Sequence, residues 1–146
     1  MTPELREAVL GVYAEVDAAV RAAGPRCVAS GKCCRFAEYG HTLFLSRFEA
    51  EVLLESAPDY DRPVTRDGCP FQMNGLCTAR AERPLGCRIY HCDPAFEGVG
   101  EAITEAALGR LKRLADEHAA GWEYAPLHHF LNRAERPPTG GRVSLL

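Results

Sequence analysis

The chain has 146 residues, of which 47% are hydrophobic and 25% charged, and its formal net charge is −3. This composition is that of an ordinary globular protein, and the length predicts a single domain over residues 1–146 with its own hydrophobic core. The slightly acidic balance excludes a strongly basic surface, so nucleic acid is not an expected partner. We find neither a long apolar run nor a secretory signal and therefore expect no membrane association and a cytoplasmic location.

The first predicted helix begins at Pro3, which suits the first helical position, and Thr2 can cap it. Gly24 and Pro25 are expected to end it. Apolar residues recur at helical spacing and predict one buried face: Leu5, Val9, Val12, Val16, Ala19 and Ala23. We expect this face to pack on the core of the same chain. The alternative is a coiled coil with a protein partner, which would make the chain a homodimer through its N-terminal helix.

A second helix is predicted after Ser46. Ser46 and Glu49 form a capping box, in which each side chain satisfies a backbone N–H at the start of the helix. The apolar face of this helix consists of Phe48, Val52 and Leu53. Pro58 ends the helix, and a polar, turn-rich stretch follows as far as Gly68.

Two further helices are predicted in the C-terminal third. The longer one runs from about Glu101 to Ala120 and presents one face with Ile103, Ala107, Leu111, Leu114 and His118. The shorter one covers Ala125 to Ala134, and Trp122 and Tyr124 are expected to anchor it against the core. Residues 136–146 contain paired prolines and paired glycines and are predicted to be a loose tail. The predicted fold class is therefore mainly α, a small helical domain around an irregular cysteine-rich centre.

All cysteines of the chain lie in residues 27–92, which we define as the cysteine-cluster region. They are Cys27, Cys33, Cys34, Cys69, Cys77, Cys87 and Cys92. In the cytosol thiols stay reduced, so this cluster favours a metal site over a disulfide framework, and an odd number also prevents complete pairing. Asn74-Gly75 predicts a tight turn. Its short apolar flanks allow a small β-hairpin that would bring Cys69 toward Cys77.

Four short elements follow one another in this region. They are Gly31-Lys32-Cys33-Cys34-Arg35, Cys69-Pro70-Phe71, Gly75-Leu76-Cys77 and Arg83-Pro84-Leu85-Gly86-Cys87-Arg88. With them, the stretch from about Cys27 to Cys92 resembles the YkgJ-type cysteine-cluster proteins, a family described as a zinc- or iron-chelating domain. The resemblance implies a metal-chelating domain, bacterial and cytosolic in most cases, without a single agreed reaction. Some relatives, including the flagellin lysine methylases, look like carriers of an iron–sulfur cluster.

This chain differs from the family motif C-x-x-C-x-x-C-C at one cysteine position. Its second cysteine falls on Ser30, so one thiolate that the resemblance implies is missing. A missing ligand is the feature that distinguishes an open catalytic metal site from a closed structural one. Ser30 therefore motivates an alternative function, an enzyme that uses a thiolate-bound metal with an open coordination position.

The cysteine spacing bears on the identity of the metal. Structural zinc sites usually use paired C-x2–4-C knuckles, and the chain contains no C-x-x-C. Iron–sulfur clusters accept four thiolates from loops at wider spacing. An iron–sulfur cluster for redox or structural support is therefore narrowly favoured. The alternative is zinc, which would make the chain a zinc-stapled interaction module. The first candidate ligands are at least one of Cys33 and Cys34, together with Cys69, Cys77 and Cys87. For Cys27 and Cys92, a role as metal ligand and a role as small buried hydrophobic residue are equally consistent with the sequence.

Other polar residues near the thiols have simpler explanations than ligation. His91 adjoins Cys92 and is a candidate auxiliary ligand, although a hydrogen-bonded surface histidine is the commoner case. His128 and His129 would face about 100° apart on a helix and so cannot form a helical metal-binding pair. Three arginines flank the cysteines and either lower thiol pKa values or form ion pairs, namely Arg35, Arg83 and Arg88. No hydrolase or phosphate-binding motif is present, so the sequence leaves open whether the chain is an enzyme.

Overall fold

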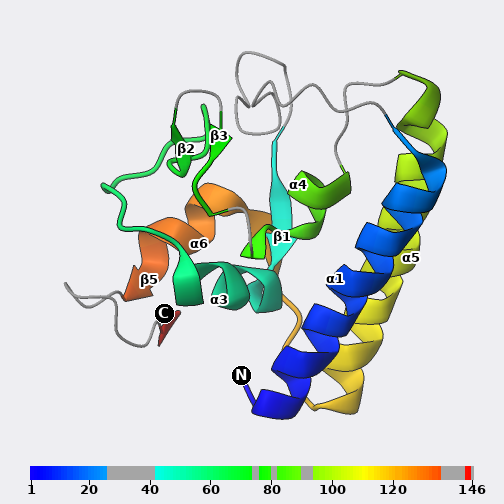
Figure 1. Cartoon of the computed structure of the whole chain (residues 1–146). Coiled ribbons are helices and arrows are strands. Elements are labelled where there is room, and N and C mark those ends of the chain that lie inside the picture. Colours follow the sequence, from blue (N-terminus) through cyan, green and yellow to red (C-terminus); the bar gives the residue numbers. More distant parts are fainter. Residues whose placement is uncertain (26–41, 74–75, 80–81, 90–93, 136–143, 146) are drawn as a thin grey trace.

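The computed structural model describes residues 1–25, 42–73, 76–79, 82–89, 94–135 and 144–145. The described helices and strands are, in order, α1 (Pro3–Ala23), β1 (Phe44–Ser46), α3 (Arg47–Ser56), β2 (Gln72–Met73), β3 (Leu76–Cys77), α4 (Leu85–Ile89), the 3-10 helix η3 (Pro94–Phe96), α5 (Glu97–Glu117), β4 (Tyr124–Pro126), α6 (Leu127–Arg133), β5 (Ala134–Glu135) and β6 (Ser144–Leu145). The fold is mainly helical, as predicted. The two long helices α1 and α5 lie side by side in opposite directions, and the remaining elements lie beside this pair (Figure 1).

Helix α1 begins and ends where the sequence predicts. The Thr2 hydroxyl accepts the N–H of Leu5 at 3.1 Å, and Gly24 adopts a left-handed conformation with φ of 63°. The predicted face is buried at four positions, together with Tyr13: Leu5, Val9, Val12 and Val16. This face packs within the chain, as the simpler of the two alternatives predicts. Ala19 and Ala23, which continue the predicted face toward the end of the helix, are exposed.

Helix α3 separates two hydrophobic clusters and contributes to both. On one side, α3 packs with α1, α4 and α5 through Phe48 and Val52. On the other side, it packs with α6 and β1 through Ala50, Leu53 and Leu54. We call this second set, which also contains Cys87, the α3–α6 cluster. Each large apolar side chain buried in these clusters contributes roughly 1.5–3 kcal/mol to stability.

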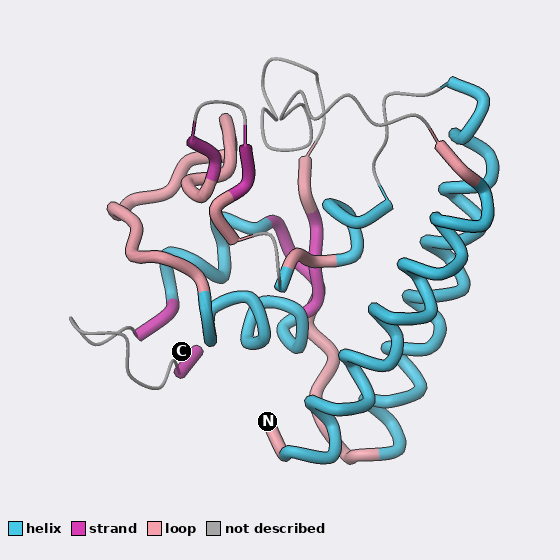
Figure 2. The backbone as a smooth tube through the Cα atoms, in the orientation of Figure 1, coloured by secondary structure: helices cyan, strands magenta, loops and turns pink. Residues whose placement is uncertain are grey.

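Strand pairing between distant segments corrects one predicted helix. The shorter C-terminal helix begins at Leu127, not at Ala125, because residues 124–126 form β4 and pair with β1 (Figure 2). Leu45 lies opposite Ala125 in this antiparallel pair, and the Leu127 N–H donates to the Leu43 carbonyl at 2.9 Å. A helical pattern over Ala125–Ala134 does not reveal this pairing, since the partner strand lies far earlier in the chain.

The long helix α5 starts at Glu97, before the predicted position, and stops earlier than predicted. Gly98 and Gly100 have low helix propensity, which argues locally against a helix start at Glu97. A Cβ at Gly100 would lie 3.0 Å from Phe96 Cε1, so glycine allows the helix start to pack on η3. The helix ends at Glu117, and Ala119 has a φ of 51°, a left-handed conformation that cannot continue a helix.

Two short strand pairs complete the described structure. The predicted hairpin is present as β2 and β3, in which Gln72 lies opposite Cys77. The tail predicted to be loose ends in β6, whose Leu145 pairs with Ala134 in β5, while residues 136–143 and 146 lie outside the described residues. None of the described helices combines the length and apolar character needed to cross a membrane.

Candidate functional site

Three of the predicted metal ligands fall within the described residues, namely Cys69, Cys77 and Cys87. Among the described residues all three are thiols, and no disulfide joins any two of them. The other predicted ligands lie outside the described residues: Cys27, Cys33, Cys34 and Cys92. Ser30, His91 and Arg35 lie outside them as well. The described part of the candidate site therefore consists of the hairpin, the residues just before it and α4.

The three described thiols come from separate parts of the chain and lie against one hydrophobic cluster. Cys69 precedes β2, Cys77 is in β3, and Cys87 is in α4. Cys87 belongs to the α3–α6 cluster and is 7% exposed, whereas Cys69 and Cys77 are half-buried and pack on the same cluster. All three thiols thus contact one hydrophobic cluster.

Backbone hydrogen bonds connect the residues around Cys69 to the hairpin that carries Cys77. The Gln72 N–H donates to the Cys69 carbonyl at 3.4 Å, and Gln72 itself lies opposite Cys77. The Thr78 N–H donates to the Phe71 carbonyl at 2.8 Å and extends the pairing by one residue. Phe71 is buried and anchors the hairpin in the core. The predicted hairpin is thus present, and its role of bringing these two cysteines toward each other stays a prediction.

Helix α4, which carries Cys87, is a short helix that its neighbours hold in place. The N–H groups of Cys87 and Arg88 donate to the Pro84 carbonyl at 3.1 and 3.2 Å. A Cβ at Gly86 would overlap Leu43 Cδ1, so glycine is needed for the close approach of α4 to the buried Leu43 side chain. The position of the Cys87 thiol therefore depends on contacts made by its immediate sequence neighbours.

Glu49 also contacts α4, and the sequence did not reveal this role. Its carboxylate is 1% exposed and accepts the Leu85 N–H at 2.8 Å, in addition to the capping bonds with Ser46. Burial raises the pKa of Glu49, and hydrogen bonds from the Ser46 and Leu85 backbone oppose this shift. The capping box predicted where Glu49 lies in the helix. It gave no sign of the bond to Leu85, which is 36 residues away.

Arg88 forms an ion pair, which is one of the two roles predicted for the arginines near the cysteines. Its Nη1 lies 2.8 Å from Asp17 Oδ2, and its Nε donates to the Arg83 carbonyl at 2.6 Å. Arg83 Nη1 in turn donates to the Cys87 carbonyl at 3.4 Å. Burial raises the pKa of Tyr13, which packs under Arg88, well above its ordinary value. These groups support the backbone of the Cys87 turn.

The two adjacent histidines of α6 take no part in a thiol site among the described residues. His129 Nε2 lies 3.2 Å from Glu123 Oε2, and Arg133 binds the same carboxylate at 3.1 Å. Trp122 stacks on Tyr124 and meets the edge of Phe48, so it anchors the start of β4 as well as the helix that follows.

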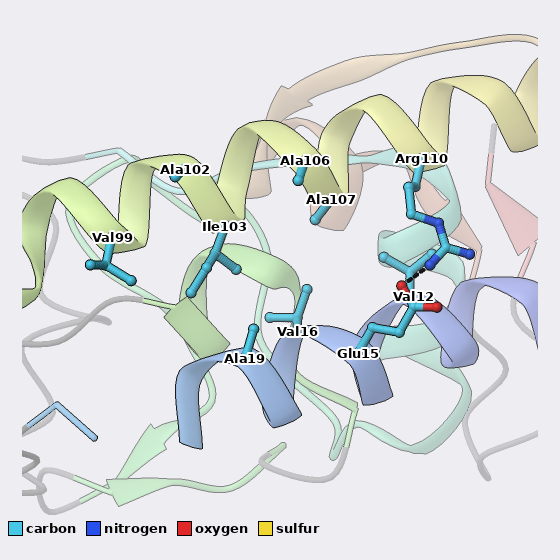
Figure 3. A pocket seen from close by; sticks show the side chains of 10 residues that line it. All are labelled: Val12, Glu15, Val16, Ala19, Val99, Ala102, Ile103, Ala106, Ala107 and Arg110. Carbon is cyan, nitrogen blue, oxygen red and sulfur yellow. Dashed lines mark ion pairs between the residues drawn. The ribbon is translucent and has the colours of Figure 1, made fainter. Parts of the chain in front are cut away.

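A groove of about 340 Å³ between α1 and α5 is separate from the cysteines (Figure 3). Its walls are mainly valine, isoleucine and alanine side chains from both helices. An ion pair between Glu15 and Arg110 spans one end (Figure 3). None of the described cysteines lines this groove.

Within the part of the chain that the structure describes, no three Cys, His, Asp or Glu side chains form a group that could hold a metal ion. Comparison with family models, curated proteins and solved structures gives no significant match. The resemblance to the YkgJ-type proteins therefore stays a prediction that rests on the four sequence elements.

Proposed function

We propose that the chain is a metal-binding protein whose cysteine-cluster region holds an iron–sulfur cluster for redox or structural support. The observation that supports the proposal is that Cys69, Cys77 and Cys87, all as thiols, pack on the same α3–α6 cluster, although these three described residues alone do not form a metal-binding group. Thiolates are the ligands that soft metals and iron–sulfur clusters prefer. In this proposal Cys69 before the hairpin, Cys77 in β3 and Cys87 in α4 are three of these ligands.

The three described cysteines are too few for such a centre, so the rest of the cysteine-cluster region would have to supply a further ligand. A tetrahedral zinc site or a four-thiolate cluster needs four ligands, and the described residues provide three cysteines. At least one further ligand must come from the remaining cysteines, namely Cys27, Cys33, Cys34 and Cys92. Ligation would then tie the N-terminal part of the region to the hairpin and α4, and binding would stabilise the fold.

A second candidate is a zinc-stapled interaction module, which the burial of Cys87 favours. A ligand that is 7% exposed and packed in the hydrophobic core suits a closed structural site better than one open to substrate. The enzyme alternative depends on Ser30, which lies outside the described residues. The variant Ser30→Cys tests the enzyme alternative. If its metal content and any activity equal those of the wild-type protein, Ser30 does not mark an open coordination position.

Metal analysis of protein purified without oxygen tests the proposal. An iron–sulfur protein is brown and contains iron with inorganic sulfide, whereas a zinc module is colourless and contains zinc. Cys69→Ala, Cys77→Ala and Cys87→Ala are each expected to lower the metal content. Val64→Ala is the matched control, because it shortens a buried side chain of the same cluster without removing a thiol. Full metal loading in all three cysteine variants would refute their role as ligands.

A further inference from the structure

Glu49 is a buried charged side chain that the proposed metal centre does not use directly. Among the described residues it is the only acidic or basic one in the buried class. Burying a carboxylate is unfavourable unless hydrogen bonds replace its water shell. An apolar side chain of similar volume would fill the same space without this penalty. The distinctive contribution of Glu49 must therefore lie in the hydrogen bonds that it accepts.

The two carboxylate oxygens of Glu49 bind two different helices. Oε2 accepts the N–H and the hydroxyl of Ser46, at 2.7 and 2.9 Å, at the start of α3. Oε1 accepts the N–H of Leu85, at 2.8 Å, at the first residue of α4. Hydrogen bonds to a charged acceptor are stronger than neutral ones. One side chain thus joins the starts of two helices that are distant in sequence.

Helix α4 depends on such external contacts. It has five residues, and a helix this short is not stable by itself. Its first N–H would have no intrahelical acceptor, since the first N–H groups of any helix lack one. Glu49 supplies that acceptor at Leu85, which shares the short helix with Cys87. A shift at Leu85 would therefore be passed directly to the Cys87 thiol.

We propose that Glu49 is a positioning residue for the cysteine centre. By holding the Leu85 N–H, Glu49 fixes the first turn of α4 and so the direction of the Cys87 thiol. The inference rests on the proposed function for its metal. The orientation of the Cys87 thiol, however, is a property of the metal-free protein as well, and it can be measured separately.

Glu49→Gln and Ser46→Ala form a matched pair of variants. Glutamine has one acceptor oxygen, so either the Ser46 N–H or the Leu85 N–H must face an NH2 group. Alanine at position 46 removes the hydroxyl bonds of the same capping box and leaves the bond between Glu49 and Leu85 intact. If Glu49→Gln does not fold, Glu49→Met replaces it, because methionine fills the space without placing an N–H against Leu85.

The first measurement is site-resolved alkylation of the reduced, metal-free chain, quantified by mass spectrometry. The rate at Cys87 is expressed relative to Cys69 and Cys77 in the same molecules, which corrects for global unfolding. We expect Glu49→Gln to raise this ratio several-fold and Ser46→Ala to leave it unchanged. Equal ratios in the two variants would overturn the proposal and reduce Glu49 to an ordinary helix cap.

The second measurement is Co²⁺ binding, followed by the thiolate-to-cobalt absorption and by competition with a chelator. We expect Glu49→Gln to weaken Co²⁺ binding about tenfold, the lower end for residues that orient a ligand, and Ser46→Ala to bind like the unchanged chain. A similar affinity in both variants would also overturn the proposal. If the unchanged chain binds no Co²⁺, the proposed function fails, and the alkylation ratio still decides the role of Glu49.

Discussion

The guanidinium carbon of Arg88 lies 4.2 Å from the centre of the Tyr13 ring, so the turn that carries Cys87 is stacked on α1. Arg88 also pairs with Asp17 on the same helix. Its side chain is 9% exposed, which places the ion pair at the edge of the core. These contacts connect the candidate metal site to the long helix pair.

Arg88→Met is expected to destabilise the protein by about 1–3 kcal/mol, because the cation–π contact and the hydrogen bonds of a largely buried guanidinium are lost. Urea unfolding followed by circular dichroism measures this loss. Arg6→Met is the matched control on α1, since Arg6 pairs with Glu55 at the surface, where ion pairs contribute little. Equal losses in the two variants would contradict the importance that we assign to Arg88.

Glu49 gives the free energy of unfolding a defined pH dependence. Burial raises its pKa in the folded state above the ordinary value of 4.5, so the folded chain holds this proton more tightly than the unfolded chain. The resulting stabilisation is complete below the unfolded pKa and is lost as the pH rises through the folded pKa. The difference in the free energy of unfolding between the wild-type protein and Glu49→Gln should therefore shift against the wild type as the pH rises above about 4.5.

Urea unfolding of the wild-type protein and of Glu49→Gln at several pH values measures this difference. The contributions of the other titrating groups cancel, because both proteins contain them. A difference that grows with pH would mean that the hydrogen bonds from Ser46 and Leu85 outweigh burial, and that the pKa of Glu49 is lowered in the folded state.

Gly86→Ala is expected to destabilise the fold by about 1–3 kcal/mol, since its Cβ would overlap the buried Leu43 side chain. Gly11→Ala is the control, because a Cβ at this exposed position of α1 would have nothing within 4 Å. There alanine should stabilise the helix by about 0.5–1 kcal/mol through its higher helix propensity. Thermal unfolding compares the two variants. A neutral Gly86→Ala would show that α4 can move away from Leu43.

The need for a fourth thiolate can be tested with one multiple variant. Replacing Cys27, Cys33, Cys34 and Cys92 by alanine leaves three cysteines. Its Co²⁺ complex should lose about a quarter or more of the thiolate absorption per cobalt, because a closed site contains four ligands. Unchanged absorption would mean that the cysteines of the hairpin and α4 bind the metal without help.

Local sequence patterns predicted much of the framework of this fold. The cap at Thr2 and the capping box at Ser46 each act over a few residues, so they can be recognised from the sequence alone. The pairing of β1 with β4 could not be recognised, because neither short strand has a pattern that identifies its distant partner. The bond from Leu85 to Glu49 was hidden for the same reason.

The sequence indicates which residues could form the candidate site but not how they are arranged. The density of cysteines favours a metal site, which stays a prediction, and the hairpin that carries Cys77 is present as predicted. Whether Cys87 lies in the core or at the surface depends on how α4 packs on Leu43 and Glu49. Those contacts arise from tertiary structure, and periodicity within so short a helix carries no information about them.

X-ray absorption spectroscopy of the protein purified without oxygen identifies a bound metal and its ligand atoms together. We expect an iron edge with sulfur as the nearest neighbour and a second iron beyond it. A zinc edge with about four sulfurs at about 2.3 Å would indicate the zinc-stapled interaction module instead. The absence of a bound metal, or a first shell of oxygen and nitrogen alone, would contradict the claim that these thiolates hold a metal centre.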